Sequence, residues 1–197
     1  RREESCVSKF TKQAIIDTFI KMLEVKSLDK ITVKELVKEC GINRNTFYYY
    51  YKDIYDLLED IFIQESSRII SENRDDKFFY EEYMRELNVM MEYKNALMHV
   101  YNSKSREIIE NYLLSVMPQF IRHYVVEKIR QNNYTEVREE DISFICDFYK
   151  YAVSGCTIEW ISGGMQQNQE EFVRKMSYIF DGTISAAVES CLCDNHT

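Results

Sequence analysis

Residues 31–53, ITVKELVKECGINRNTFYYYYKD, contain two short helical patterns on either side of a glycine. The first pattern opens at Thr32. Glu35 completes a capping box, in which a hydroxyl and a carboxylate satisfy free backbone N–H groups at the start of a helix. This helix must end at Gly41, which can adopt the left-handed backbone of a tight turn. Asn43 is a favourable N-cap, so the second helix is expected to begin directly after the turn.

The second helix is polar at nearly every position. Phe47 is its one plain core residue, and the other side chains are donors, acceptors and aromatic hydroxyls. Arg and Asn near the start of such a helix fit the major groove of DNA, where Arg pairs with guanine and Asn with adenine. Hydroxyl groups suit phosphate oxygens, which fix the register without reading the sequence. We therefore take Arg44 and Asn45 as candidate base readers, and Thr46 and Tyr48 as candidate phosphate contacts.

Another amphipathic pattern precedes this stretch. Its apolar residues recur on one face of a helix and are Ile15, Ile16, Phe19, Ile20 and Leu23. Three short helices with a glycine turn between the last two form the outline of a helix-turn-helix, although many helical hairpins share this outline. We expect a DNA-binding domain over residues 1–52.

The charge distribution supports this interpretation. The chain as a whole has a net charge of −8, which is unusual for a DNA-binding protein. Residues 1–52 contain 11 Lys or Arg and 7 Asp or Glu, a net charge of +4, whereas residues 53–197 contain 14 and 26, a net charge of −12. Attraction for phosphate is therefore confined to the N-terminal part of the chain.

Residues 31–53 resemble the DNA-binding domain of TetR-type transcriptional regulators, and the resemblance extends from about residue 9 to residue 63. It implies that the threonine opening the second helix contacts phosphate and that the start of the third helix reads bases. It also implies that the tyrosine after the buried aromatic residue binds the DNA backbone, with its neighbour at the DNA surface. The expected DNA-binding residues are Thr32, Val33, Asn43, Arg44, Asn45, Thr46, Tyr48, Tyr49 and Lys52.

The chain departs from the family pattern at two places. The family usually has His-Phe where this chain has Tyr50-Tyr51, and we expect Tyr51 to take the buried aromatic position. Family members often have a lysine near the start of the fourth helix that contacts phosphate, whereas this chain has Ile54 there. Lys52 is the expected substitute.

The composition favours long helices throughout. One proline and five glycines in 197 residues are far fewer turn residues than an all-β fold needs. After residue 52, helices are expected over about 53–73, 77–93, 94–101, 104–131, 141–163 and 169–191, with loops at 73–76 and 132–139. Pro118 should kink or divide its helix. The predicted fold is all-α, with a three-helix DNA-binding domain (1–52) and a C-terminal helical bundle for ligand binding and dimerisation (53–197).

Residues 148–165, FYKYAVSGCTIEWISGGM, resemble a segment from one branch of TetR C-terminal domains. Dihydroxyacetone kinase operon activators belong to this branch, and some of its members respond to a partner protein in place of a small molecule. In the family, the last two helices of each subunit form a four-helix dimer interface. We therefore expect a homodimer, although the same apolar stripes could instead close the monomer core. The residues expected at the interface are Ala152, Cys156, Trp160, Phe172, Met176, Ile179, Phe180, Thr183, Ile184 and Ala187.

Soft and aromatic residues on the central helices are candidates for a ligand pocket, although such stripes more often form core. These residues are Met84, Met91, Met98, Tyr101, Phe120, Tyr124, Phe148 and Tyr149. No cofactor or metal is expected. His99 and His123 are more typical of structural histidines, and the six irregularly spaced cysteines are typical of reduced thiols. The pair Cys191 and Cys193 is the one alternative metal or redox site.

The sequence contains none of the common catalytic signatures, such as a Gly-rich phosphate loop, Gly-x-Ser-x-Gly or His-Glu-x-x-His. No signal peptide is visible and no apolar run is long enough to cross a membrane, so a cytoplasmic location is expected. We expect a regulator that is not an enzyme and that binds a palindromic DNA operator as a homodimer, most simply a repressor released by a small-molecule or protein effector. The alternatives are a transcriptional activator and a helical interaction module controlled by a partner protein.

Overall fold

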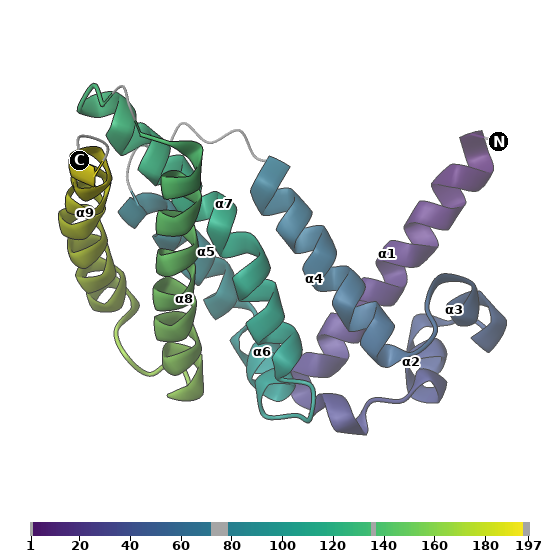
Figure 1. Cartoon of the computed structure of the whole chain (residues 1–197). Coiled ribbons are helices and arrows are strands. Elements are labelled where there is room, and N and C mark those ends of the chain that lie inside the picture. The colour runs from purple at the N-terminus through teal and green to yellow at the C-terminus, as the bar shows by residue number, and fades with distance from the viewer. Residues whose placement is uncertain (1, 72–78, 135–136, 195–197) are drawn as a thin grey trace. The chain divides into compact units, whose positions relative to one another are not determined.

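The computed structural model describes the backbone of residues 2–71, 79–134 and 137–194, and the side chains of residues 9–68, 79–134 and 137–192. All regular structure in these residues is helical, which confirms the all-α prediction (Figure 1). The elements are α1 (Arg2–Val25), the 3-10 turn η1 (Leu28–Lys30), α2 (Val33–Cys40), α3 (Arg44–Tyr50), α4 (Ile54–Ser71), α5 (Phe79–Glu92), α6 (Lys94–Tyr101), α7 (Glu107–Gln131), α8 (Glu139–Ser162) and α9 (Gln169–Asp194).

The helix bounds follow the predicted ones closely. The loop expected at residues 73–76 lies outside the described residues. Pro118 does not divide α7, which continues from Glu107 to Gln131. Leu113 and Ile121, one on each side of the proline, are both fully buried, so the same apolar stripe continues through it. In the described part of the chain, no helix combines the length and the apolarity needed to cross a membrane.

The chain forms two compact units. Unit 1 comprises Arg1–Ser67 and Tyr93–Ile109, and unit 2 comprises Arg68–Glu92 and Glu110–Thr197. This division differs from the boundary expected after residue 52, because most of α4 and the whole of α6 belong to unit 1.

Unit 1 is built around α1, which packs against both α2 and α6, while α2 packs against α3. Of the predicted stripe of α1, Ile15, Ile16, Phe19 and Leu23 are buried, and Ile20 is half-buried. Other helices contribute Leu28, Leu36, Phe47, Leu57 and Val100 to the core.

Polar contacts hold α6 to the end of α1. The first N–H groups and last carbonyl groups of a helix have no partners within it. The Glu24 carboxylate accepts a hydrogen bond from the backbone N–H of Ala96 in the first turn of α6 (3.3 Å). His99 Nδ1 lies 2.5 Å from the carbonyl oxygen of Leu23 in the last turn of α1. Each helix thus provides a side-chain partner for a terminal backbone group of the other, and His99 has a structural role.

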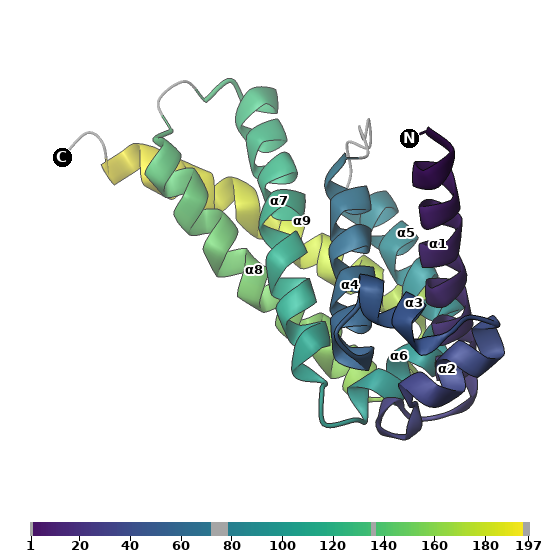
Figure 2. The ribbon, with the colours of Figure 1, turned by 90° about the vertical axis from the view of Figure 1, so that its right-hand side faces the viewer.

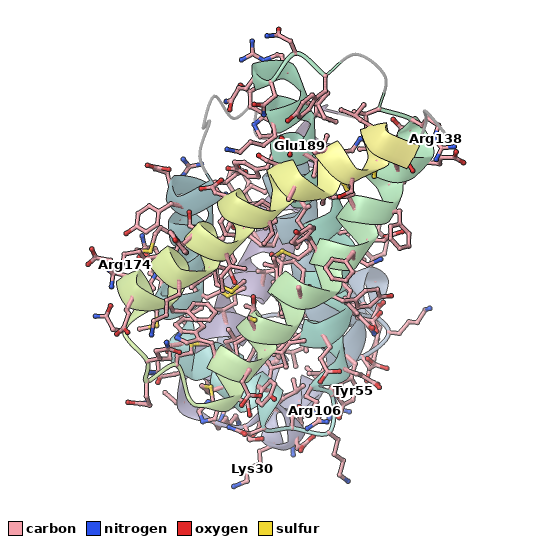
Figure 3. The ribbon with its side chains drawn as sticks, turned by 60° about the vertical axis from the view of Figure 1, so that its left-hand side comes forward. Lys30, Tyr55, Arg106, Arg138, Arg174 and Glu189 are labelled. Carbon is pink, nitrogen blue, oxygen red and sulfur yellow. The ribbon has the colours of Figure 1, made fainter. Side chains whose placement is uncertain are left out.

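Unit 2 contains an aromatic core between α5, α7, α8 and α9. Helix α9 packs against α5 and α8, and the α8–α9 pair is seen face-on in Figure 3. Phe79 stacks on Phe180 with ring centroids 4.3 Å apart, and Trp160 stacks on Phe172 at 5.7 Å. The cluster is completed by Tyr83, Phe120 and Tyr124, all of which are buried.

Buried hydroxyls within this core form a directional chain. Thr157 Oγ1 donates to the carbonyl of Val153 (2.7 Å), and Tyr83 Oη lies 2.6 Å from the same Oγ1. Because the threonine proton is already used, the Tyr83 hydroxyl is the donor of the second bond. Burial raises the pKa of Tyr83 above its ordinary value, which keeps the phenol protonated and able to donate.

This direction predicts unequal costs for two conservative substitutions. Tyr83→Phe should lower the free energy of unfolding by about 1 kcal/mol, because Thr157 keeps its own acceptor. Thr157→Val should cost more, about 2–3 kcal/mol, because it leaves the Tyr83 hydroxyl buried without an acceptor. Urea denaturation of full-length variants at one fixed protein concentration measures both values. Equal losses for the two variants would contradict the assigned direction.

Candidate nucleic-acid interface

The start of α2 has the predicted capping box. The Glu35 backbone N–H donates to Thr32 Oγ1 (3.3 Å), and the Thr32 N–H donates to Glu35 Oε2 (3.2 Å). Hydrogen bonds from Lys26 and Thr32 lower the pKa of Glu35. The helix ends at Gly41, whose φ of 71° and ψ of 26° lie in the left-handed region. Local chemistry therefore sets both ends of α2, as expected from the sequence.

Helix α3 begins at the predicted cap. Asn43 Oδ1 accepts a hydrogen bond from the backbone N–H of Thr46 (2.8 Å). Phe47 is the buried residue of α3, with an exposed fraction of 0%, and its ring packs edge-on against Tyr48. The helix is therefore attached to unit 1 by one face and presents its other faces to solvent.

Figure 2 shows α2 and α3. Most of the predicted DNA-binding residues, which lie in or next to these two helices, are exposed. Tyr48 and Tyr49 have exposed fractions of 55% and 79%. Val33 and Thr46 are half-buried. The exposed members of the set are Thr32, Asn43, Arg44, Asn45, Tyr48, Tyr49 and Lys52.

Two of the hydroxyls expected to contact phosphate donate their protons within the domain. Thr32 Oγ1 donates to Glu35 Oε2 (3.0 Å), and Thr46 Oγ1 donates to Asn43 Oδ1 (3.1 Å). A phosphate oxygen only accepts hydrogen bonds, so either threonine must exchange its present bond before it can hold a phosphate. Tyr48 is free of this constraint among the hydrogen bonds of the described residues.

A polar network that the sequence did not reveal anchors the end of α3. Tyr51, the C-cap of α3, is 3% exposed, so it takes the predicted buried aromatic position. Its hydroxyl donates to Asp60 Oδ2 of α4 (2.9 Å), and the same carboxylate forms an ion pair with Lys12 of α1 at 2.9 Å. Gln64 adds a further hydrogen bond (2.7 Å). The i,i+4 spacing of Asp60 and Gln64 is the only sequence signal for this network.

The network shifts the pKa values of Tyr51 and Asp60. Burial raises the pKa of Tyr51, and the hydrogen bond to Asp60 raises it further. Burial also raises the pKa of Asp60, but hydrogen bonds from Lys12 and Tyr51 outweigh that effect and lower it below the ordinary value of 3.8. Asp60 is therefore ionised, and Tyr51 neutral, near pH 7.

The residues predicted for the dimer interface divide into two groups. Trp160, Phe172, Phe180 and Ile184 are buried inside unit 2, so the prediction that they face a second subunit is corrected. These four side chains lie on the faces of α8 and α9 that pack in the core of unit 2. Each of the two helices also has a second apolar face, which is exposed. The remaining residues are Ala152, Cys156, Ile179 and Thr183, which are exposed, and Met176 and Ala187, which are half-buried.

The candidate pocket residues also lie in different surroundings. Met98 and Tyr101 belong to unit 1, whereas the other six belong to unit 2. Phe120 and Tyr124 pack in the aromatic core, with ring centroids 5.6 Å apart. Phe148 is 62% exposed. Met84, Met91 and Tyr149 are half-buried.

The structure describes the side chains of four of the six cysteines. Cys40, Cys146, Cys156 and Cys191 are free thiols, and Cys191 Sγ donates to the carbonyl of Ala187 (3.3 Å). Burial raises the pKa of the Cys146 thiol to about 11. The side chains of Cys6 and Cys193 lie outside the described ones. Among the described residues, no group of three or more His, Cys, Asp or Glu side chains could hold a metal ion.

Two family models match the sequence. The model described as bacterial regulatory proteins of the tetR family matches residues 15–61, and the model described as a transcriptional regulator C-terminal region matches residues 84–182, half of the chain. The chain belongs to the TetR family of bacterial transcriptional regulators. The resemblance seen in residues 31–53 is thereby confirmed.

Individual relatives agree with this assignment. The chain is 23% identical over 159 residues to the HTH-type dhaKLM operon transcriptional activator DhaS of Lactococcus lactis, covering 80% of this chain and 82% of that protein. The solved structure of dihydroxyacetone kinase operon activator DhaS matches with a TM-score of 0.71 and 20% identity, covering 89% of this chain and 97% of that one.

More distant TetR-like structures share the fold. A transcriptional regulator from Pseudomonas aeruginosa PAO1 matches with a TM-score of 0.61 and 11% identity, covering 91% of this chain and 93% of that one. A tetR-family regulator from Streptomyces coelicolor matches with a TM-score of 0.55 and 14% identity, covering 94% and 90%. At these identities the likeness concerns the fold.

One position that departs from the TetR pattern has a structural explanation. Ile54, which stands where family members often have a phosphate-contacting lysine, is 6% exposed and opens α4 as part of the core. Asp53 caps this helix by accepting hydrogen bonds from the N–H groups of Tyr55 and Asp56. The exposed Lys52 lies directly before this cap, where its ammonium group is accessible.

The Asp60 network predicts a pH-dependent contribution to stability. A carboxyl whose pKa is lowered by folding stabilises the protein above its unfolded pKa, and this contribution is lost as the pH falls through the folded pKa. Asp60→Asn should therefore lower the free energy of unfolding at pH 7 by about 1 kcal/mol, since the ion pair is partly exposed. The difference from the parent protein should shrink below about pH 4.

Denaturant unfolding at pH 7, 5 and 3.5 measures this difference. Asp17→Asn is the matched control, because Asp17 is an exposed carboxylate of α1 bonded within its own helix to Gln13. A deficit of Asp60→Asn that stays constant across this pH range would contradict the assignment.

Proposed function

We propose that this TetR-family regulator binds a two-fold symmetric DNA operator as a homodimer, with α3 of each subunit in the major groove. The proposal rests on the exposed side chains of α3, a seven-residue helix that is held to the core of unit 1 through Phe47. Its outer faces offer the Arg44 guanidinium, the Asn45 amide and the Tyr48 and Tyr49 hydroxyls. A helix of this kind has the width and the donor groups that major-groove recognition requires.

Electrostatics favour DNA as the partner of this part of the chain. Residues 1–52 have a net charge of +4, against −12 for the remainder. Cations at exposed positions can neutralise phosphates, and each neutralised phosphate releases counterions. The exposed cations of this region are Lys9, Lys21, Lys30, Lys34, Lys38, Arg44 and Lys52.

The outer face of α8 and α9 supports dimerisation. Large apolar side chains are exposed there at helical spacing, namely Phe144, Phe148, Tyr151, Tyr178 and Ile179. A Cβ atom added at Gly155 or Gly182 would meet no other atom within 4 Å, so both backbones are open to close approach. A surface that combines exposed aromatic residues with small ones is typical of a protein interface. We assign this face, instead of the buried stripe, to the four-helix contact between subunits.

The direction of regulation has two candidates. Repression by operator occupancy, released by a small-molecule or protein effector, is the usual mode of the family. Activation is favoured by the similarity to the Lactococcus lactis protein, which is named a transcriptional activator. Transcription from a promoter that contains the selected binding site, measured with and without the protein, distinguishes the two.

Disruption of the outer α8–α9 face should separate the subunits. Ile179→Glu places a charge on this face and should convert the dimer to monomers, or raise its dissociation constant at least tenfold. Ile63→Glu in α4 is the matched control, because Ile63 and Ile179 are exposed to the same degree, 63% and 60%. Sedimentation velocity over a concentration series gives both results. Dimers of equal strength in the two variants would contradict the assignment.

DNA recognition should respond differently to two changes in α3. Arg44→Ala should relax the base preference and cost about 1–3 kcal/mol if the contact is bidentate. Tyr48→Phe should weaken binding to all sequences alike, because phosphate contacts carry no sequence information. Fluorescence anisotropy with a site selected from random DNA measures both effects.

A salt titration of the same complex separates DNA recognition from a purely protein-binding role. The logarithm of the association constant should fall linearly with the logarithm of salt concentration, by about 0.9 for each phosphate contact. Equal affinity of the Arg44→Ala protein and the parent for the selected site would reject the base-reading role of Arg44. A flat salt dependence would favour the helical interaction module.

A further inference from the structure

The two asparagines that flank Arg44 differ in what they can offer to a base. Asn43 Oδ1 accepts hydrogen bonds from the Thr46 backbone N–H (2.8 Å) and from Thr46 Oγ1 (3.1 Å). A backbone N–H can only donate, so the Asn43 atom facing it must be the carbonyl oxygen. The oxygen is thus committed to the helix cap, and Asn43 has only its NH2 group left for another partner.

Asn45 has no such commitment. Its side chain is exposed, and it makes no hydrogen bond to any other residue among those that the structure describes. Both the amide oxygen and the NH2 group of Asn45 are therefore available. The difference follows from position, because Asn43 precedes the first turn of α3 and Asn45 lies within it.

Helix geometry also places Asn45 where it faces outward. Successive residues of an α-helix are rotated by about 100°, which sets Asn45 about 160° from Phe47 around the helix axis. Phe47 is fully buried, so the Asn45 side chain lies on the side of α3 that faces away from unit 1. Tyr49 shares this outer stripe, and its exposed fraction of 79% agrees with the geometry. Arg44 lies about 60° from Phe47, on one flank.

Recognition of adenine in the major groove requires both groups of an amide. The oxygen accepts from adenine N6, and the NH2 group donates to N7. Asn45 can supply both groups from its present position. Asn43 could do so only by releasing the cap that starts α3, since its oxygen cannot serve the Thr46 N–H and an adenine N6 in the same orientation.

We infer that Asn45 determines the adenine specificity of this regulator, reading one adenine in each half-site, and that Asn43 positions α3 without bidentate base recognition. The inference rests on the proposed function, because it assigns a base to one side chain of the proposed reading helix. It separates two residues of the same type, two positions apart, into a specificity role and a positioning role.

Selection from random double-stranded DNA tests the inference with the full-length protein and three variants at one salt concentration. Asn45→Ala should lose the adenine preference at one position of each half-site while keeping the rest of the motif. Discrimination at that position should fall by roughly one order of magnitude. Asn43→Ser should keep the adenine preference at that position, because serine is an equally good N-cap. Asn43→Ala should weaken binding to all sequences alike, since it removes the cap.

A second measurement tests the same contact from the side of the DNA. Replacing the assigned adenine by 7-deazaadenine removes the N7 acceptor, which should weaken the parent protein and leave Asn45→Ala unaffected. The inference is overturned if Asn45→Ala retains the adenine preference, or if Asn43→Ser loses it. A parent protein that enriches no sequence would contradict the proposed function itself, whereas a clear motif without these responses would contradict the inference alone. Circular dichroism of each variant checks that it is folded.

Discussion

The position of α3, and with it of the exposed side chains proposed to contact DNA, depends on the burial of Phe47. A seven-residue helix is not stable in isolation, because nucleation costs more than so few hydrogen bonds return. Phe47 fixes one face of α3 in the core, the Asn43 cap fixes its first turn, and the Tyr51–Asp60 bond fixes its end. With these three attachments, α3 keeps four exposed side chains that are available for a partner, namely Arg44, Asn45, Tyr48 and Tyr49.

The features of α2 and α3 that could be predicted from the sequence are those set by residues close to one another in the chain. The Thr32–Glu35 box and the Gly41 turn each involve residues within a few positions, and the structure has both. The Lys12–Asp60–Tyr51 network could not be predicted, because its members are up to 48 positions apart and charged residues have many alternative partners. Helical periodicity gives the faces of a helix but not their distant contacts.

The same limit explains why the sequence did not show which apolar faces of α8 and α9 are buried. Helices α8 and α9 each have two apolar faces, one with Trp160 and Phe180 and another with Phe148 and Tyr178. Periodicity identifies both stripes, but only the packed structure shows which one meets the aromatic core. The membership of α6 in unit 1 was equally hidden, since its contacts with α1 join residues 72 and 76 positions apart. The chain passes between the two units at three points. Unit 2 therefore has three covalent connections to unit 1, the unit that contains α3.

In the proposed complex, two copies of this chain present paired α3 helices to one face of a duplex. Hydroxyl-radical footprinting of a selected DNA site tests it most directly, because the cleavage pattern reports where the protein covers the backbone. A dimer with paired α3 helices should give two protected patches that are related by two-fold symmetry and separated by about one helical turn, ten base pairs, or more. A single unsymmetric patch, or uniform cleavage at protein concentrations that saturate the site, would contradict it.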